Sequence, residues 1–490
     1  MKKLLAGFLL SLLSAACGGA PERPPRAPGS VLWVEPASLG RLDAATFDEL
    51  RAAGVRELFL SGFELEWDGP RARIEAPANL VEGPRAPVSL VISGAWPEGL
   101  GDTAEEAARS LRVEFERMRL EAEAAGLLPV GFHLVPSTAS SWADVAEVVE
   151  ALMAGLGEGM GVSLQMEEST LGVEAAERIG RAVDCLVVFL YGQDPGEAEV
   201  AARWRFNRVV ERTRVLDELR VDYLIGVRTL GAAYRLAADG QRIAWTVNAS
   251  PGDLVRDPAL GRGRDRILHG LDRRAMTIEA ERPTDFGSWR LAEGERIRAV
   301  QVLPVHLIDL RERLREAALK HHLGEVFYRL PAEGEGMALG AADLAAALSG
   351  FAAPMAIEVD TATVSVDGDQ WTFRVILRNV GQRSTDIAFF DQNFARVEVE
   401  GGVVLSARAG AFRRYQLDKD GEEIRNMRAL RTADGLRLYV PVLEPGDEVR
   451  SGPVVVRGEG GRPPALLLGG HFLLPGGGEL DLDRQPRSAR

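Results

Sequence analysis

Polar side chains directly follow short apolar runs in the middle of the chain, and these residue types could do chemistry. Glu167 and Glu168 come after the run 162–166, and Asp194 follows the run 184–191. Glycoside hydrolysis needs two carboxyl groups flanking one bond, roughly 5 Å apart for retention or roughly 6.5–9.5 Å apart for inversion. We therefore predict Glu167 or Glu168, paired with Asp194, as candidate catalytic residues. Because the side chains of adjacent glutamates point in different directions, only one of Glu167 and Glu168 can be part of the catalytic pair. The alternative for these glutamates and Asp194 is a structural role, on a solvated rim of the fold or at the start of a helix.

Four other side chains are candidates for substrate binding: His133, Tyr191, Arg228 and Arg329. A tyrosine ring can stack on a sugar, and an arginine fork donates two parallel hydrogen bonds. The alternatives are structural. His133 lies between two apolar residues, as a hydrogen-bonded core histidine would, and Arg329 has acids nearby to pair with.

Motifs for metal, nucleotide or disulfide chemistry are missing. The sequence contains no HExxH motif and no histidine beside carboxylates at metal-ligand spacing, so we predict no metal and no cofactor. Of the two cysteines, Cys17 lies near the N-terminus and Cys185 in an apolar run, which argues against a disulfide between them. The formal net charge of −14 argues against nucleic acid as a partner, since phosphate binding needs a basic surface.

Eight short apolar runs alternate with helical patterns between residues 31 and 352, which predicts an α/β fold. The runs are Val31–Glu35, Arg56–Ser61, Pro87–Ser93, Pro129–Val135, Val162–Met166, Asp184–Tyr191, Asp222–Val227 and Glu325–Leu330. Helical spacing marks the segments 44–53, 104–125, 142–156, 173–183, 203–220 and 305–320. Eight such units are typical of a (β/α)8, TIM-like barrel, in which the carboxyl ends of the strands carry the site. A doubly wound open sheet is the alternative, weakened by the absence of GxGxxG after the first strand.

Two inserted segments interrupt the alternation of predicted strands and helices. Residues 63–74 predict a hairpin turning at Asp68-Gly69-Pro70. Residues 230–299 form a long insertion that opens with a hairpin turning at Asp239-Gly240. Insertions on barrel loops usually build the wall of the active face.

The C-terminal part, residues 353–490, changes to a period of two with frequent turn signals, which predicts an all-β sandwich. The segments WTFRVILRNVGQRSTD (371–386) and VPVLEPGDEVRSG (440–452) resemble immunoglobulin-like modules of bacterial surface proteins. Residues 412–431 are polar and predict a long exposed connection. Residues 483–490 predict a disordered end.

The N-terminal residues predict where in the cell the protein is located. Lys2 and Lys3 precede an apolar stretch, 4–13, and small residues lead into Cys17, as in a signal peptide of residues 1–16. This resembles a bacterial lipobox, which implies lipidation of Cys17 and a membrane anchor; Ser14 replaces the leucine usual there. Gly18 implies no retention in the inner membrane, and the proline-rich residues 17–30 predict a tether. The alternative is an ordinary secretory signal with a coincidental cysteine.

Three segments, VDCLVVFLYGQ (183–193), VDYLIGVRTLGAAYRLAADGQ (221–241) and GEVFYRLPAEGEGMALGAADLAAAL (324–348), resemble a family of bacterial glycoside-hydrolase-like barrels, often lipoproteins. The resemblance implies closely spaced aspartates at the end of the fourth strand. The corresponding residues here, GFHLVPS (131–137), contain no carboxylate.

These observations predict a lipoprotein of the cell envelope, in the outer membrane of a Gram-negative bacterium. We expect it to bind a glycan or an envelope protein through the loop face of the barrel. The alternatives are a glycoside hydrolase that cleaves a polysaccharide with paired carboxylates, and a structural lipoprotein that binds proteins through its sandwich.

Overall fold

A computed structural model describes residues 28–78, 80, 85–157, 160–167, 170, 174–189, 206–257, 259–260, 268–269, 274–350, 355–388, 392–424, 432–475 and 478–488. The described residues form two compact units. One contains the barrel strands, and the other contains the inserted sheet, three described α-helices and the C-terminal sandwich. None of the described helices is both long enough and apolar enough to cross a membrane.

The first unit is a closed barrel of eight parallel strands, as predicted. The strands are β1 (Ser30–Val34), β2 (Val55–Asp68), β4 (Pro87–Trp96), β5 (Leu128–Ala139), β6 (Gly161–Glu167), β7 (Cys185–Phe189), β8 (Tyr223–Arg228) and β16 (His322–Tyr328). They are hydrogen-bonded in the order β1-β16-β8-β7-β6-β5-β4-β2, and pairing of β1 with β2 closes the ring. Closure rules out the open doubly wound sheet.

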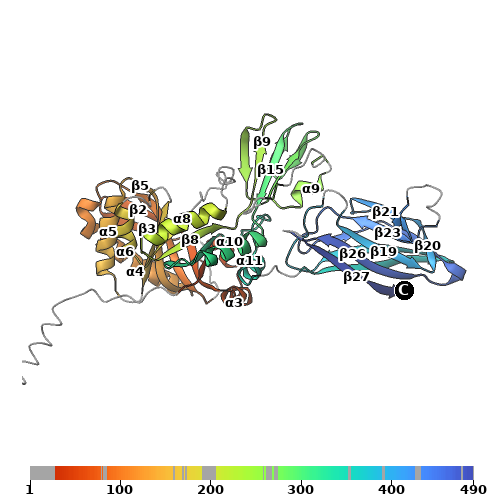
Figure 1. The fold of residues 1–490 in the computed structure, drawn as a ribbon, viewed down its shortest axis with the longest axis horizontal. Helices are drawn as coiled ribbons and strands as arrows, with labels where there is room; N and C mark the ends of the chain where they lie inside the picture. Colours follow the sequence, from red (N-terminus) through yellow and green to blue (C-terminus); the bar gives the residue numbers. More distant parts are fainter. Residues whose placement is uncertain are drawn as a thin grey trace, which may run out of the picture. The chain divides into compact units, whose positions relative to one another are not determined.

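Helices between the strands bury their apolar stripes on the outside of the barrel. They are α2 (Pro36–Leu39), α3 (Ala44–Ala52), α4 (Ala104–Ala124), α5 (Trp142–Gly155), α6 (Glu174–Ala182) and α8 (Phe206–Glu218), with a 3-10 turn η1 (Gly101–Thr103) before α4 (Figure 1). In α4 the buried residues recur every three or four positions, and Phe115 stacks on Phe132 of β5 with ring centroids 3.9 Å apart. Ser141 caps α5, because its side chain accepts a hydrogen bond from the Asp144 N–H.

The barrel interior is packed with side chains from alternate strand positions. The buried cluster comprises Val31, Trp33, Phe59, Val91, Cys185, Val187, Phe189, Leu224 and Val326, with Val135, Leu323 and Tyr328 partly buried against it. Trp33 makes edge contacts with the rings of Phe59, Phe189 and Tyr328. Gly226 of β8 leaves the space that the Phe189 ring fills.

The predicted hairpin at residues 63–74 is confirmed. β2 continues beyond the barrel and pairs antiparallel with β3 (Arg71–Glu75). Between Leu60 and Phe63 the pairing of β2 with β4 shifts register. Gly62, with φ of 100°, occupies that shift in a conformation that favours glycine.

The insertion forms its own antiparallel sheet in the second unit. Its strands are β9 (Ala232–Leu236), β10 (Arg242–Thr246), β11 (Leu268–His269), β12 (Arg274–Glu279) and β15 (Arg296–Gln301), in the order β10-β9-β15-β12-β11. A small hairpin, β13 (Thr284–Phe286) with β14 (Trp289–Leu291), and the helices α9 (Asp253–Arg256), α10 (Pro304–Glu316) and α11 (Ala341–Leu348) complete this part. β9 and β10 form the predicted hairpin.

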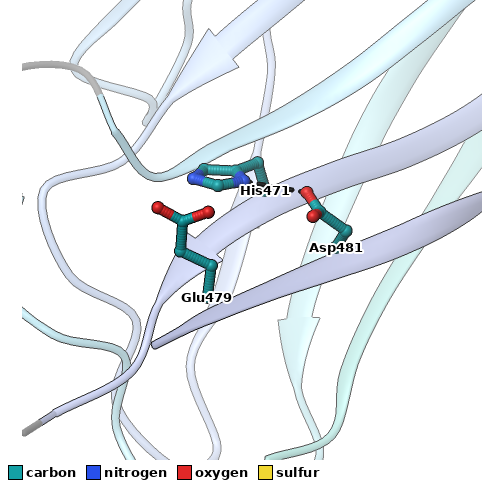
Figure 2. Close-up of side chains that lie close together, drawn as sticks. All are labelled: His471, Glu479 and Asp481. Carbon is teal, nitrogen blue, oxygen red and sulfur yellow. Dashed lines mark hydrogen bonds and ion pairs between the residues drawn. The ribbon is translucent and has the colours of Figure 1, made fainter. Parts of the chain in front are cut away.

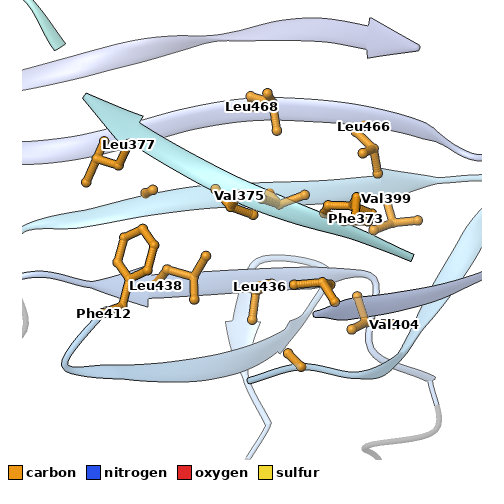
Figure 3. Packing of buried hydrophobic residues seen from close by; sticks show 14 of the residues in the cluster. Phe373, Val375, Leu377, Val399, Val404, Phe412, Leu436, Leu438, Leu466 and Leu468 are labelled. Carbon is orange, nitrogen blue, oxygen red and sulfur yellow. The ribbon is translucent and has the colours of Figure 1, made fainter. Parts of the chain in front are cut away.

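The C-terminal part is a sandwich of two antiparallel sheets. One contains β17 (Ile357–Asp367), β18 (Gln370–Asn379), β20 (Gly402–Ser406), β24 (Glu448–Arg450) and β25 (Val454–Gly458). The other has the order β22-β21-β23-β19-β26-β27: β22 (Glu422–Glu423), β21 (Arg414–Lys419), β23 (Gly435–Tyr439), β19 (Phe394–Glu400), β26 (Ala465–Leu473) and β27 (Glu479–Ser488). Inward-facing residues such as Val375, Leu438 and Leu468 meet in one core (Figure 3). The resemblance to immunoglobulin-like modules stays a prediction.

Two sequence predictions in this part are wrong. Residues 414–423 are not an exposed connection but contain β21 and β22, with Asp418 buried beside Arg437. Residues 483–488 are not disordered but belong to β27, which pairs along β26. In β21, the charged and polar residues on one face of the strand hid Leu417 on the other, which packs against the core.

Candidate functional site

The barrel mouth gathers polar side chains at the carboxyl ends of three adjacent strands, β1, β16 and β8. Register sets them at one level: Leu32 lies opposite Phe327, and Tyr328 lies opposite Arg228. Glu35 follows β1, and Arg329 follows β16. Their side chains therefore meet above the aromatic residues that fill the barrel.

Glu35 and Arg329 form an ion pair across β1 and β16. Arg329 Nε lies 2.9 Å from Glu35 Oε1; the arginine side chain is 11% exposed and the glutamate 37%. A guanidinium–carboxylate contact at this distance is a charge-assisted hydrogen bond. The structural alternative for Arg329, pairing with a neighbouring acid, is confirmed, whereas its part in substrate binding stays a prediction.

Tyr328 lies beside both arginines, next to Arg329 in the chain and opposite Arg228 in the strand pairing. Burial raises the pKa of the Tyr328 phenol, and the charge of Glu35 adds to that, whereas Arg329 and Arg228 act in the opposite direction. Its ring makes edge contacts with Trp33, at 5.2 Å between centroids, and with Phe189, at 5.7 Å. Tyr328 thus supplies a hydroxyl group that can both donate and accept a hydrogen bond at the mouth.

Arg228 is the fourth polar residue at the mouth, and it comes from β8, the third of these strands. It is the last residue of β8, and its side chain is 7% exposed. Together Glu35, Tyr328, Arg228 and Arg329 offer one carboxylate, one hydroxyl group and two guanidinium forks above an aromatic floor of Trp33 and Phe189.

His133 lies deeper in the barrel than its prediction as a binding residue suggests. It is fully buried, its Nδ1 lies 2.9 Å from Ser163 Oγ, and its ring stacks on Phe59 with centroids 4.4 Å apart. Its ring also meets the edge of Trp33, at 5.7 Å. His133 therefore packs against the aromatic floor, and a direct contact with a ligand stays a prediction.

The predicted catalytic pair is only partly described. Glu167 is exposed at the end of β6, level with Phe189 of β7. Glu168, Tyr191, Asp194 and Cys17 lie outside the described residues, so the proposed carboxylate pair stays a prediction. The fourth barrel strand, Leu128–Ala139, is in place and carries no carboxylate along its length. Within the described part of the barrel, no three metal-ligating side chains converge.

Sequence reasoning missed Trp33 as the centre of the aromatic floor. A signal was present, because Val31, Trp33 and Glu35 alternate along β1 and must share one face. The same alternation in the eighth strand places Val326 and Tyr328 inside.

Comparisons with known proteins found similar solved structures at low sequence identity. The chain matches no protein-family model and no curated protein. It is similar to the spore cortex-lytic enzyme SleL of Bacillus cereus, with 14% identity and a TM-score of 0.43 over 68% of this chain and 76% of that one. It is similar to the chitinase ChiA74 of Bacillus thuringiensis, with 9% identity and a TM-score of 0.41 over 89% and 98% of the two chains. A chitinase of Bacteroides thetaiotaomicron gives 10% identity and a TM-score of 0.38 over 62% and 90%. The assignment of the barrel depends on the strand pairing and not on these matches.

Proposed function

We propose that the barrel mouth binds a glycan. The observation that carries this proposal is the group Glu35, Tyr328, Arg228 and Arg329 at the ends of three adjacent strands, above the rings of Trp33 and Phe189. Sugars present hydroxyl groups around an apolar face, so they match forked donors and a carboxylate set beside aromatic side chains. Binding sites on this fold lie at the carboxyl ends of the strands.

Binding is favoured over hydrolysis by two features of the mouth. The fourth strand, β5, offers no carboxylate. Glu35 is held by the Arg329 guanidinium, which suits a hydrogen-bond acceptor better than a proton donor. Glycoside hydrolysis requires one acid that gives a proton and a second carboxylate across the bond.

Titration of the purified chain with soluble peptidoglycan fragments, chitin oligosaccharides and storage glycans tests the proposal. We expect calorimetry to detect binding to one class, and chromatography with mass spectrometry to find the glycan uncleaved. Arg329→Lys keeps the charge but loses the fork, and Tyr328→Phe loses only the hydroxyl group. Hydrogen bonds to charged groups contribute about 1.5–3 kcal/mol, so we expect Arg329→Lys to weaken binding roughly 10-fold or more.

Arg51→Lys is the matched control, because Arg51 is an exposed arginine on α3 that pairs only with Asp48 in the contacts described. Its affinity should equal that of the unchanged protein. Absence of binding to every glycan class, or binding that neither mouth variant weakens, would refute the proposal. Release of shorter products, abolished by Glu167→Gln, would instead support the hydrolase.

We further propose that the chain acts at the cell envelope, anchored through a lipid on Cys17. The support is the sequence of the first 18 residues. Labelling with a radioactive fatty acid should mark the protein, and Cys17→Ala should abolish both the label and its recovery with membranes. Unlabelled protein that is recovered from the medium would contradict the anchor.

A further inference from the structure

The terminal hairpin of the sandwich brings a histidine and two carboxylates together on one face. β26 and β27 pair antiparallel, with His471 opposite Asp481 and Leu473 opposite Glu479. Side chains alternate along strands, so His471, Glu479 and Asp481 share the outer face, whereas Phe472, Leu480 and Leu482 pack on the core side.

The three ligand atoms lie close enough to meet at one point. His471 Nδ1 lies 2.8 Å from Asp481 Oδ1, and one ligand atom from each of the three residues lies within 4.8 Å of the others. Figure 2 shows the carboxylates of Glu479 and Asp481 beside the imidazole of His471, with a dashed line marking the contact between His471 and Asp481. A zinc ion with bonds of about 2.1 Å needs ligand atoms about 3.4 Å apart, so a pair at 4.8 Å must close by about 1.4 Å and the His471–Asp481 pair must open by about 0.6 Å. Glu479 and Asp481 are exposed and can make that movement by side-chain rotation.

The imidazole is held in place from the next strand. Its ring stacks on Phe394 of β19 with centroids 5.7 Å apart, and Arg437 of β23 lies over the same Phe394 ring at 5.3 Å. Such packing fixes the histidine before any ligand arrives, which lowers the entropic cost of binding.

The two carboxylates lack a cation among the described residues. The nearby arginines are engaged elsewhere on the outer face: Arg437 pairs with Asp418 at 2.7 Å, and Arg396 pairs with Glu398 at 2.6 Å. In the described part of the sandwich, no arginine or lysine forms an ion pair with Glu479, and Asp481 pairs only with His471. A divalent cation at this point would offset both negative charges.

We propose that His471, Glu479 and Asp481 bind a divalent transition-metal ion of the zinc class. Imidazole with carboxylates suits zinc and its neighbours, whereas calcium and magnesium prefer sites built of oxygen alone. Three protein ligands leave a further coordination position for water or for a group from a partner. Because the ligands come from both strands, the ion also ties the edge strand β27 to β26.

Zinc binding to the full chain, purified without a histidine tag, tests the site. We expect one zinc ion per chain by calorimetry and by elemental analysis after dialysis, and no measurable binding of calcium or magnesium. His471→Ala should weaken zinc binding about 100-fold or more, and Glu479→Gln and Asp481→Asn about 10-fold or more. Zinc should also slow hydrogen exchange in β27 of the unchanged protein and not in His471→Ala.

His321→Ala is the matched control, since His321 also lies beside an aspartate, Asp222, at 3.3 Å, but has no third ligand among the described residues. It should leave zinc binding unchanged. Glu479→Gln changes one exposed side chain without removing the packing of His471, so a loss of binding there does not reflect unfolding; circular dichroism checks this. Absence of zinc binding, or stoichiometric binding that survives both His471→Ala and Glu479→Gln, would overturn the proposal.

Discussion

Replacing Gly226 by alanine tests how the barrel is filled just below its mouth. A Cβ atom added at Gly226 would overlap the Phe189 ring and lie 2.5 Å from Cε1 of that ring, closer than real Cβ contacts. The ring has no room to withdraw, because Trp33 and Tyr328 meet it edge-on at 6.1 Å and 5.7 Å between centroids. Overpacking of a filled interior costs about 1–3 kcal/mol, and we expect Gly226→Ala to destabilise the barrel by that amount.

Hydrogen exchange followed by mass spectrometry measures this cost locally, because peptides from β7 and β8 report the opening of the barrel separately from the sandwich. Phe189→Leu removes the overlapped ring edge, so the double variant should be more stable than the sum of the two single changes by about 1 kcal/mol or more. Gly157→Ala is the control, since nothing lies within 4 Å of its added Cβ atom. It should change stability by less than about 0.5 kcal/mol. A neutral Gly226→Ala, or strictly additive effects with Phe189→Leu, would show that the Phe189 ring does not fill the barrel as described.

Three further predictions concern stability, measured by urea denaturation. Asn379 is buried, and its side-chain amide donates to the carbonyl oxygens of Arg383 at 2.8 Å and Leu443 at 3.0 Å. The Leu443 oxygen also accepts from the Thr385 N–H, so Asn379→Ala removes both amide hydrogen bonds and should cost about 1–3 kcal/mol; a change below a few tenths would contradict this. Ser141→Ala removes the cap of α5 and should cost about 1 kcal/mol, whereas Ser141→Asp should restore it. Burial raises the pKa of the Asp418 carboxyl, against the charge of Arg437. A raised pKa in the folded state means that stability falls as pH rises through that pKa. Arg437→Gln should therefore destabilise the sandwich more at about pH 7 than at about pH 4.5, and an equal loss at both pH values would refute it.

The barrel could be predicted because its signals are local. Runs such as CLVVF in β7 are apolar on both faces, which is the pattern of a strand buried between a core and helices. Helices between them carry apolar residues at three- and four-residue spacing, as in α4. Alternation of these two patterns is sufficient to indicate eight strand–helix units.

The sandwich shows where local signals are insufficient. In β21, Arg414, Gln416 and Asp418 occupy the outer face, so the segment looks like a solvated loop. Asp418 is nevertheless only 1% exposed, because Arg437 from β23 pairs with it. Burial of a charge depends on a partner elsewhere in the chain, and no window of neighbouring residues reveals that partner.

The candidate functional residues also divide into those that the sequence indicates and those that only the structure brings together. The sequence by itself determined that polar side chains follow the barrel strands, because strand ends are visible in the alternation of apolar and polar residues. Only the tertiary structure decided that Glu35 meets Arg329, almost 300 positions later, and that His471 faces Asp481 rather than Leu480. A shift of one residue in strand pairing would turn every side chain to the opposite face, and pairing is fixed by how the whole core packs.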